Sequence, residues 1–145
     1  MKYLILGLLS LNLFAVESLV GSFAVYNIDG PTFKGIKKVA LKELNETENT
    51  YLQVTTMTKD NGDVDIVEEK VDVDDINTQQ ENLMILELCE TDLSGRKSRE
   101  TVKAGTFEAC ILKDDDSTFY FANVPFGYIK SLSDAQKVEL TSYSF

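Results

Sequence analysis

The sequence contains no histidine among its 145 residues. This absence excludes Ser-His-Asp and Cys-His catalysis, zinc sites built on imidazole, and pH switching by histidine. Two cysteines cannot complete a four-ligand zinc site, and the sequence has no glycine-rich phosphate loop and no GxSxG motif. Carboxylates are plentiful, but their places in turns and at alternating positions favour solvated acids over a glycosidase-like pair. The sequence therefore predicts a protein that is not an enzyme and needs no cofactor.

Basic residues are also scarce, with 14 Lys and Arg against 24 Asp and Glu and a net charge of −10. This balance argues against a nucleic-acid partner and against binding to anionic membrane surfaces. Two acidic groups, one at residues 72–75 and one at residues 114–116, could supply oxygen ligands to calcium. Neither follows the spacing of a calcium-binding loop, so we interpret both as turns and predict no metal site.

Long apolar runs are limited to one, residues 3–14, which follows the positively charged Lys2. About a dozen apolar residues are too few to span a bilayer but suit a signal-peptide core. We therefore predict a signal peptide over residues 1–18, cut between 15 and 18, and a single β domain over residues 19–145. The mature chain has no run long enough to span a membrane, and we expect a periplasmic or secreted protein.

Export would place the two cysteines in an oxidising compartment. An even pair in an oxidising compartment most often forms a disulfide, so Cys89 and Cys110 are the predicted partners. Two free buried thiols are the alternative. Asn45 begins an Asn-Glu-Thr glycosylation pattern, which matters only if the protein is secreted from a eukaryotic cell.

The front half of the chain reads as short strands separated by turns. Asn61-Gly62 is a strong hairpin signal between strands at residues 50–60 and 63–73. A two-residue loop would put Leu52, Val54, Val67 and Val71 on one face. Lysines every four residues allow a helix at residues 33–44, but alternation of apolar residues there favours a strand. Residues 82–90 are apolar on both faces, which predicts a central strand.

The back half predicts a strand at residues 102–112, an acidic turn, and a return strand at residues 118–124. Pro125 then ends the pairing, and its position two residues before Gly127 suits a type I turn. A last strand covers residues 137–145. About eight to ten successive strands predict an all-β fold, a curved antiparallel sheet that forms a barrel or half-barrel. A lipocalin-like barrel and a two-sheet β-sandwich are the alternatives.

The aromatic residues of this back half are the candidate ligand site. Tyr120, Phe126 and Tyr128 could line an apolar cavity at the rim of a barrel, although such sets more often belong to the core. The turn between Pro125 and Gly127 would present Phe126 at the rim. We therefore predict these three residues as a binding site for an apolar small molecule or a lipid.

Four segments of the back half carry a family resemblance. KAGTFEAC (residues 103–110), FY (119–120), VPFGYIK (124–130) and ELTSY (139–143) resemble exported bacterial β-proteins of the TapB-like group. That group belongs to families of unknown function related to LolA-type lipoprotein carriers. The sequence departs from the group in having no tryptophan in the aromatic pair. The resemblance implies a curved antiparallel sheet, export to the periplasm, and no established enzyme activity.

Three functions follow, in order of preference. The first is a non-enzymatic exported protein that binds an apolar ligand or a lipid-like partner. The second is a structural or protein-interaction module with a packed core, and a small secreted hydrolase is the least favoured. An apolar cavity of roughly 300 Å³ or more would favour the first over the second.

The signal-peptide assignment makes the first testable prediction. Protein recovered after export should have lost about 15 to 18 residues, because signal peptidase cuts after the apolar core. Intact mass measurement or N-terminal sequencing checks this. A mature protein that still begins at Met1 would contradict it.

Overall fold

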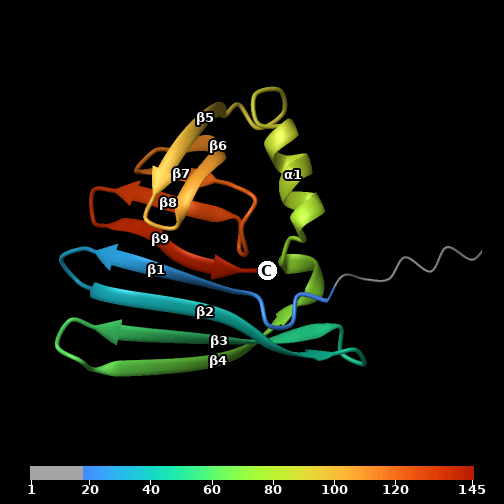
Figure 1. Ribbon diagram of the computed structural model, residues 1–145, viewed down its shortest axis with the longest axis vertical. Coiled ribbons are helices and arrows are strands. Elements are labelled where there is room, and N and C mark those ends of the chain that lie inside the picture. Colours follow the sequence, from blue (N-terminus) through green and yellow to red (C-terminus); the bar gives the residue numbers. More distant parts are fainter. Residues whose placement is uncertain (1–17) are drawn as a thin grey trace, which may run out of the picture.

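The computed structural model describes residues 18–145, and residues 1–17, which hold most of the predicted signal peptide, lie outside that range. The described chain forms one nine-stranded antiparallel sheet that does not close (Figure 1). The all-β prediction is confirmed in its half-barrel form, as a curved open sheet rather than a closed barrel or a two-sheet sandwich. The strands are β1 (Phe23–Asp29), β2 (Lys34–Asn45), β3 (Thr50–Lys59), β4 (Val64–Asp72), β5 (Arg96–Val102), β6 (Gly105–Asp114), β7 (Ser117–Phe121), β8 (Tyr128–Ser133) and β9 (Lys137–Ser144).

Two meanders meet in the middle of this sheet. The strand order is β4-β3-β2-β1-β9-β8-β7-β6-β5, so the first and last strands pair at the centre. β4 and β5 are consecutive in the chain, but they therefore lie at opposite edges of the sheet. The chain crosses between these edges through a 3-10 turn, η1 (Val73–Asp75), and one helix, α1 (Gln79–Glu87). Figure 1 shows α1 beside one end of the strands.

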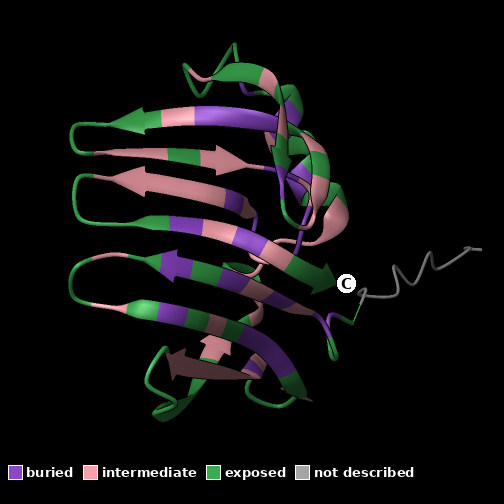
Figure 2. Cartoon of the chain, turned by 60° about the vertical axis from the view of Figure 1, so that its left-hand side comes forward, coloured by how far each residue is buried: buried purple, intermediate pink, exposed green. Residues whose placement is uncertain are grey.

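The main core follows from alternation along the central strands. In β1 the side chains of Ala24, Tyr26 and Ile28 are buried, whereas Asn27 and Asp29 are exposed, as the two-residue period of a strand requires. Figure 2 shows the same contrast for the whole chain, with buried residues along the strands and exposed residues in the turns that join them. The buried side chains that pack together here are Ala24, Tyr26, Ile28, Val102, Ala109, Ala122, Val124, Ile129, Val138 and Leu140.

The β3–β4 hairpin forms where Asn61-Gly62 predicts it, but with a longer loop. The Lys59 N–H donates to the Asp63 carbonyl at 2.9 Å, and the Gly62 N–H donates to the Lys59 carbonyl at 2.9 Å. Gly62 has a φ of 92°, the left-handed conformation typical of the last residue of a three-residue hairpin loop. The loop thus contains three residues instead of two.

One added loop residue shifts the whole register. Leu52 pairs with Lys70 instead of Val71, and Val54 pairs with Glu68. Because side chains alternate along a strand, Val67 and Val71 lie on the face opposite Leu52 and Val54. The predicted shared face for these four residues is therefore wrong.

The predicted central strand at residues 82–90 is also wrong, because most of this segment belongs to α1. Thr78 forms a capping box: its hydroxyl accepts the Glu81 N–H at 3.2 Å, and its own N–H donates to the Glu81 carboxylate at 2.7 Å. Asn82 and Leu86, one helical turn apart, are the buried side chains of the helix. The apolar residues between these two are exposed or only partly buried. The strand preferred for residues 33–44 is confirmed as β2.

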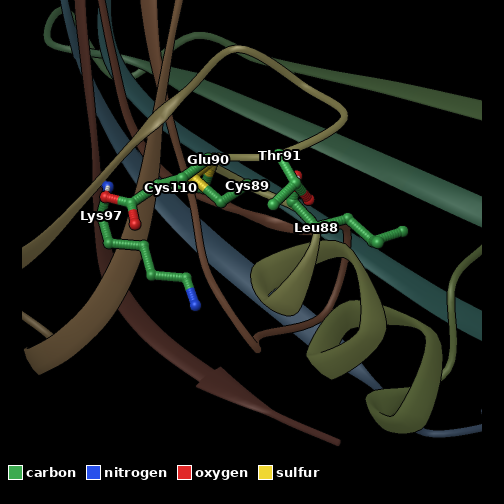
Figure 3. The surroundings of a disulfide bond; sticks show 6 residues. All are labelled: Leu88, Cys89, Glu90, Thr91, Lys97 and Cys110. Atoms are coloured by element: carbon green, nitrogen blue, oxygen red, sulfur yellow. Dashed lines mark hydrogen bonds between the residues drawn. A yellow bond between two sulfur atoms is a disulfide. The ribbon is translucent and has the colours of Figure 1, made fainter.

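The disulfide prediction is confirmed. Cys89, just after α1, is bonded to Cys110 of β6, and both residues are fully buried (Figure 3). Beside the bond, the Glu90 carboxylate accepts the Lys97 N–H at 3.2 Å. A side chain at Gly95 would lie 2.6 Å from the Cys110 sulfur, so only glycine lets the chain pass this close. The bond ties the crossover to the sheet and indicates that the protein forms in an oxidising compartment.

The disulfide gives the second prediction. It closes a loop with a sequence separation of 21, which corresponds to a stabilisation of about 3 kcal/mol in the chain-entropy model. The Cys89→Ser, Cys110→Ser double variant should lose about that much free energy of unfolding, measured by denaturant melts. A reducing agent should lower the free energy of unfolding of the wild type towards that of the double variant. It should leave the free energy of unfolding of the variant unchanged. Equal stability of wild type and double variant would contradict this.

Candidate functional site

Tyr128, one of the three predicted site residues, belongs to the core. Its ring stacks on that of Tyr26, with centroids 4.6 Å apart and planes 14° apart. The Tyr26 hydroxyl donates to the Tyr128 carbonyl at 3.2 Å. Burial raises the pKa of both tyrosines above the ordinary range, so both rings remain neutral phenols at physiological pH. Tyr128 thus supports the central strand β1.

Tyr120 lies on β7 and is half-buried. It pairs across the ladder with Lys130 of β8, whose ammonium nitrogen lies 4.6 Å from the centre of the Tyr120 ring. This geometry is that of a cation–π contact, and the ring also packs against the main core. The ring is therefore held on both sides by this chain's own residues.

Phe126 lies in a turn of a type that the sequence did not predict. The Gly127 N–H donates to the Val124 carbonyl at 3.0 Å, which closes a four-residue turn. Phe126, at the third position, has a φ of 64°, the sign that a type II turn requires there and a type I turn forbids. A bulky residue in this left-handed region costs roughly 1–2 kcal/mol. The predicted type I turn is therefore wrong, and Phe126 is held in a strained conformation.

Packing explains why this strain persists. Phe126 contacts the main core and also a second buried cluster formed by Leu19, Leu41 and Tyr51. Among residues 18–145, Phe126 is the one partly buried apolar residue that packs against both clusters. A narrow crevice beside it, bordered also by Ser22 and Pro125, leaves no room for a water-sized sphere.

The three predicted residues thus come together on one core cluster. Tyr120, Phe126 and Tyr128 all pack against the same buried residues.

Asn82 is a neighbour of this corner that sequence reasoning missed. It is fully buried on α1, and its side-chain amide donates to the Val124 carbonyl at 3.0 Å. Its carbonyl oxygen finds no hydrogen-bond partner in the described part of the chain, and neither does the buried Ser22 hydroxyl. Buried polar groups are normally satisfied, so these two atoms mark the corner as unusual. Asn82 ties the helix to the Pro125 turn.

The outer side of α1 carries the second feature missed from sequence. Four apolar side chains on the helix and the segment after it remain in solvent: Leu83, Met84, Leu88 and Leu93, which are 41–54% exposed. We call these four residues the helix ridge. The Thr78–Glu81 capping box was the available signal, since it marks a helix start just before this apolar run.

An open groove runs beside the ridge. Leu83, Leu86 and Phe107 supply its apolar wall, and its volume is about 350 Å³. Glu87, Lys97 and Glu108 supply charge, and the Asn123 side-chain oxygen, buried here without a partner, supplies an acceptor. Apolar walls with a few polar groups are typical of sites that bind small molecules, although this groove is open and partly charged.

Within residues 18–145 there is no group of three or more histidine, cysteine, aspartate or glutamate residues placed to hold a metal ion. In the same range no helix has the length and apolar character needed to cross a membrane. α1 has no basic residue, and its termini carry Glu81 and Glu87.

Comparisons with protein-family models, with curated proteins and with solved structures found no match. The resemblance to the TapB-like group therefore stays a prediction, carried only by the segments quoted above.

Phe126 gives the third prediction. Phe126→Ala should lower the free energy of unfolding by about 2–3 kcal/mol, because a half-buried ring that joins two clusters is removed. Phe126→Gly removes the same ring but accepts the positive φ, so it should be about 1 kcal/mol more stable than Phe126→Ala. Denaturant melts of the three proteins measure both differences.

The same variants test the ligand hypothesis. A loss below about 1 kcal/mol in Phe126→Ala, together with weaker binding of a fluorescent fatty acid, would show that Phe126 faces a ligand. A glycine variant less stable than the alanine variant would contradict the strain.

Proposed function

We propose that the protein is a non-enzymatic exported protein, periplasmic or secreted, that binds a partner protein through the helix ridge. The observation that carries this proposal is the exposure of Leu83, Met84 and Leu88 on a helix whose other side is anchored by a disulfide and a buried hydrogen bond. Several exposed apolar side chains close together in sequence on a fixed element are typical of interaction sites. A rigid helix also loses little conformational entropy on binding.

The ridge suits a protein better than a membrane surface. Helices that lie on anionic membranes carry Lys and Arg around their apolar face. α1 has none, whereas Glu81 and Glu87 lie in the helix and Glu90 lies in the segment after it. The net charge of −10 acts in the same direction. A protein surface with an apolar centre and a basic rim complements the ridge.

An apolar small molecule or lipid is the competing occupant. The packed corner around Phe126 gives it no volume, while the groove beside α1 is open and partly charged. Native mass spectrometry of protein purified from its own cells separates the two. A lipid-sized or small apolar mass on the protein would favour the carrier function over the interaction function.

The ridge gives the fourth prediction. A photo-crosslinking amino acid at Met84, in protein expressed in its own cells, should yield one discrete product with a second protein. The same amino acid at Asp115, exposed in the β6–β7 turn, should not. The Leu83→Gln, Leu88→Gln double variant should abolish the Met84 product, because it removes apolar contact area. Its thermal melt should stay close to that of wild type, since neither side chain belongs to the buried core.

Two results would contradict the proposed function. One is the absence of any crosslinked protein at Met84. The other is an identical set of products from Met84 and Asp115, which would indicate random collisions.

A further inference from the structure

β4 forms an open edge of the sheet. It pairs with β3 on one side and with no described strand on the other (Figure 1). All its residues from Val64 to Lys70 are exposed. An unpaired edge of nine residues presents a row of N–H and C=O groups that another chain can use.

The hydrogen-bond phase decides which groups face outward. At one end the Lys59 N–H donates to the Asp63 carbonyl, and at the other the Val73 N–H donates to the Asn49 carbonyl. Bonded pairs alternate along an antiparallel ladder, so the odd-numbered residues of β4 bond to β3. The even-numbered residues therefore direct their backbone groups away from the sheet. These residues are Val64, Ile66, Glu68, Lys70 and Asp72.

The usual protections of an edge are weak here. Proteins block edges with proline, with outward lysines or with a covering element. β4 has no proline, and its one lysine, Lys70, is already paired with Glu48. Val64 and Ile66 are 53% and 64% exposed on one face of the strand, and Val67 is 54% exposed on the other.

Charge defines the partner that this edge fits. Four acids lie along β4, and of these Asp65 is paired with Lys59, while Glu69 accepts the Gln53 amide. Glu68 and Asp72 make no ion pair within the described chain. Opposite charges across strands stabilise pairing, and like charges oppose it. The edge therefore complements an extended segment in which basic and apolar residues alternate.

We propose that β4 binds, by addition of a strand to the sheet edge, an extended segment of a partner protein in which Lys or Arg alternates with β-branched apolar residues. A second copy of this chain fits less well, because its own β4 edge carries the same excess of acids, four against one lysine. This chain's own basic stretch, β2, is bonded on both sides inside the sheet. The proposal uses a different surface from the helix ridge and so goes beyond the function proposed above.

A labelled synthetic peptide, KVKVTVKVK, tests it by fluorescence anisotropy. We expect saturable one-to-one binding to the full chain. The same peptide with N-methyl groups on the backbone nitrogens that face β4 should bind at least about tenfold more weakly, because it keeps its charge but loses its donors. A peptide with Glu in place of Lys should not bind.

Protein variants test the edge itself. Ile66→Pro removes an outward N–H that β3 does not use, so the fold should persist while affinity falls roughly tenfold or more. Ile66→Thr keeps the N–H and should lose less than about threefold. Circular dichroism and thermal melts confirm folding. If Ile66→Pro fails to fold, the Glu68→Lys, Asp72→Lys variant decides: it should weaken the basic peptide about tenfold and bind the Glu peptide.

Equal binding of the methylated and unmethylated peptides would overturn the proposal, because attraction would then be electrostatic alone. Absence of binding up to about 1 mM would also overturn it. The Leu83→Gln, Leu88→Gln variant should bind the peptide as wild type does. Peptide binding and Met84 crosslinking can therefore fail separately.

Discussion

The pairing of β1 with β9 is the constraint on which the rest of the structure depends. It joins segments about 116 residues apart, and at its centre Tyr26 and Leu140 face each other fully buried. Neither meander buries the main core alone, because that core takes residues from both. A register shift after Val25 interrupts the ladder, and the Thr141 hydroxyl there donates to the Val25 carbonyl. Such distant pairing closes late, so we expect folding to be slow for a domain of this size.

This central pairing also decides what lies outside. With the first and last strands in the middle, the edges must be β4 and β5, and the chain between them must cross the sheet. α1 is the main element of that crossing, and it packs through only two buried side chains, Asn82 and Leu86. So few contacts explain why the crossing needs the Cys89–Cys110 bond. They also explain why the apolar side chains of α1 remain exposed.

The sequence predicted features that depend on near neighbours. The β6–β7 hairpin, the all-β fold class and the disulfide follow from alternation, turn residues and an even cysteine pair. The strand predicted at residues 82–90 is wrong because a short apolar run has no distinct period. The capping box there favours the helix that the structure shows. The predicted β3–β4 register is wrong because the loop contains one more residue. That extra residue follows from the conformation of Gly62, which the sequence does not show. The aromatic residues could not be assigned to core or cavity, since both places favour the same side chains.

The corner around Phe126 connects the buried and exposed parts of the molecule. Its strained turn is held because Phe126 joins two clusters, and the Val124 carbonyl beside it accepts the Asn82 amide from α1. Asn82 and Leu83 are adjacent in the helix, so the buried anchor and the exposed ridge belong to the same helical turn. A partner that moved α1 would break the hydrogen bond from the Asn82 amide to the Val124 carbonyl. A second polar group of Asn82 would then be buried without a partner. That cost opposes movement, and it makes the ridge a surface presented in one fixed position.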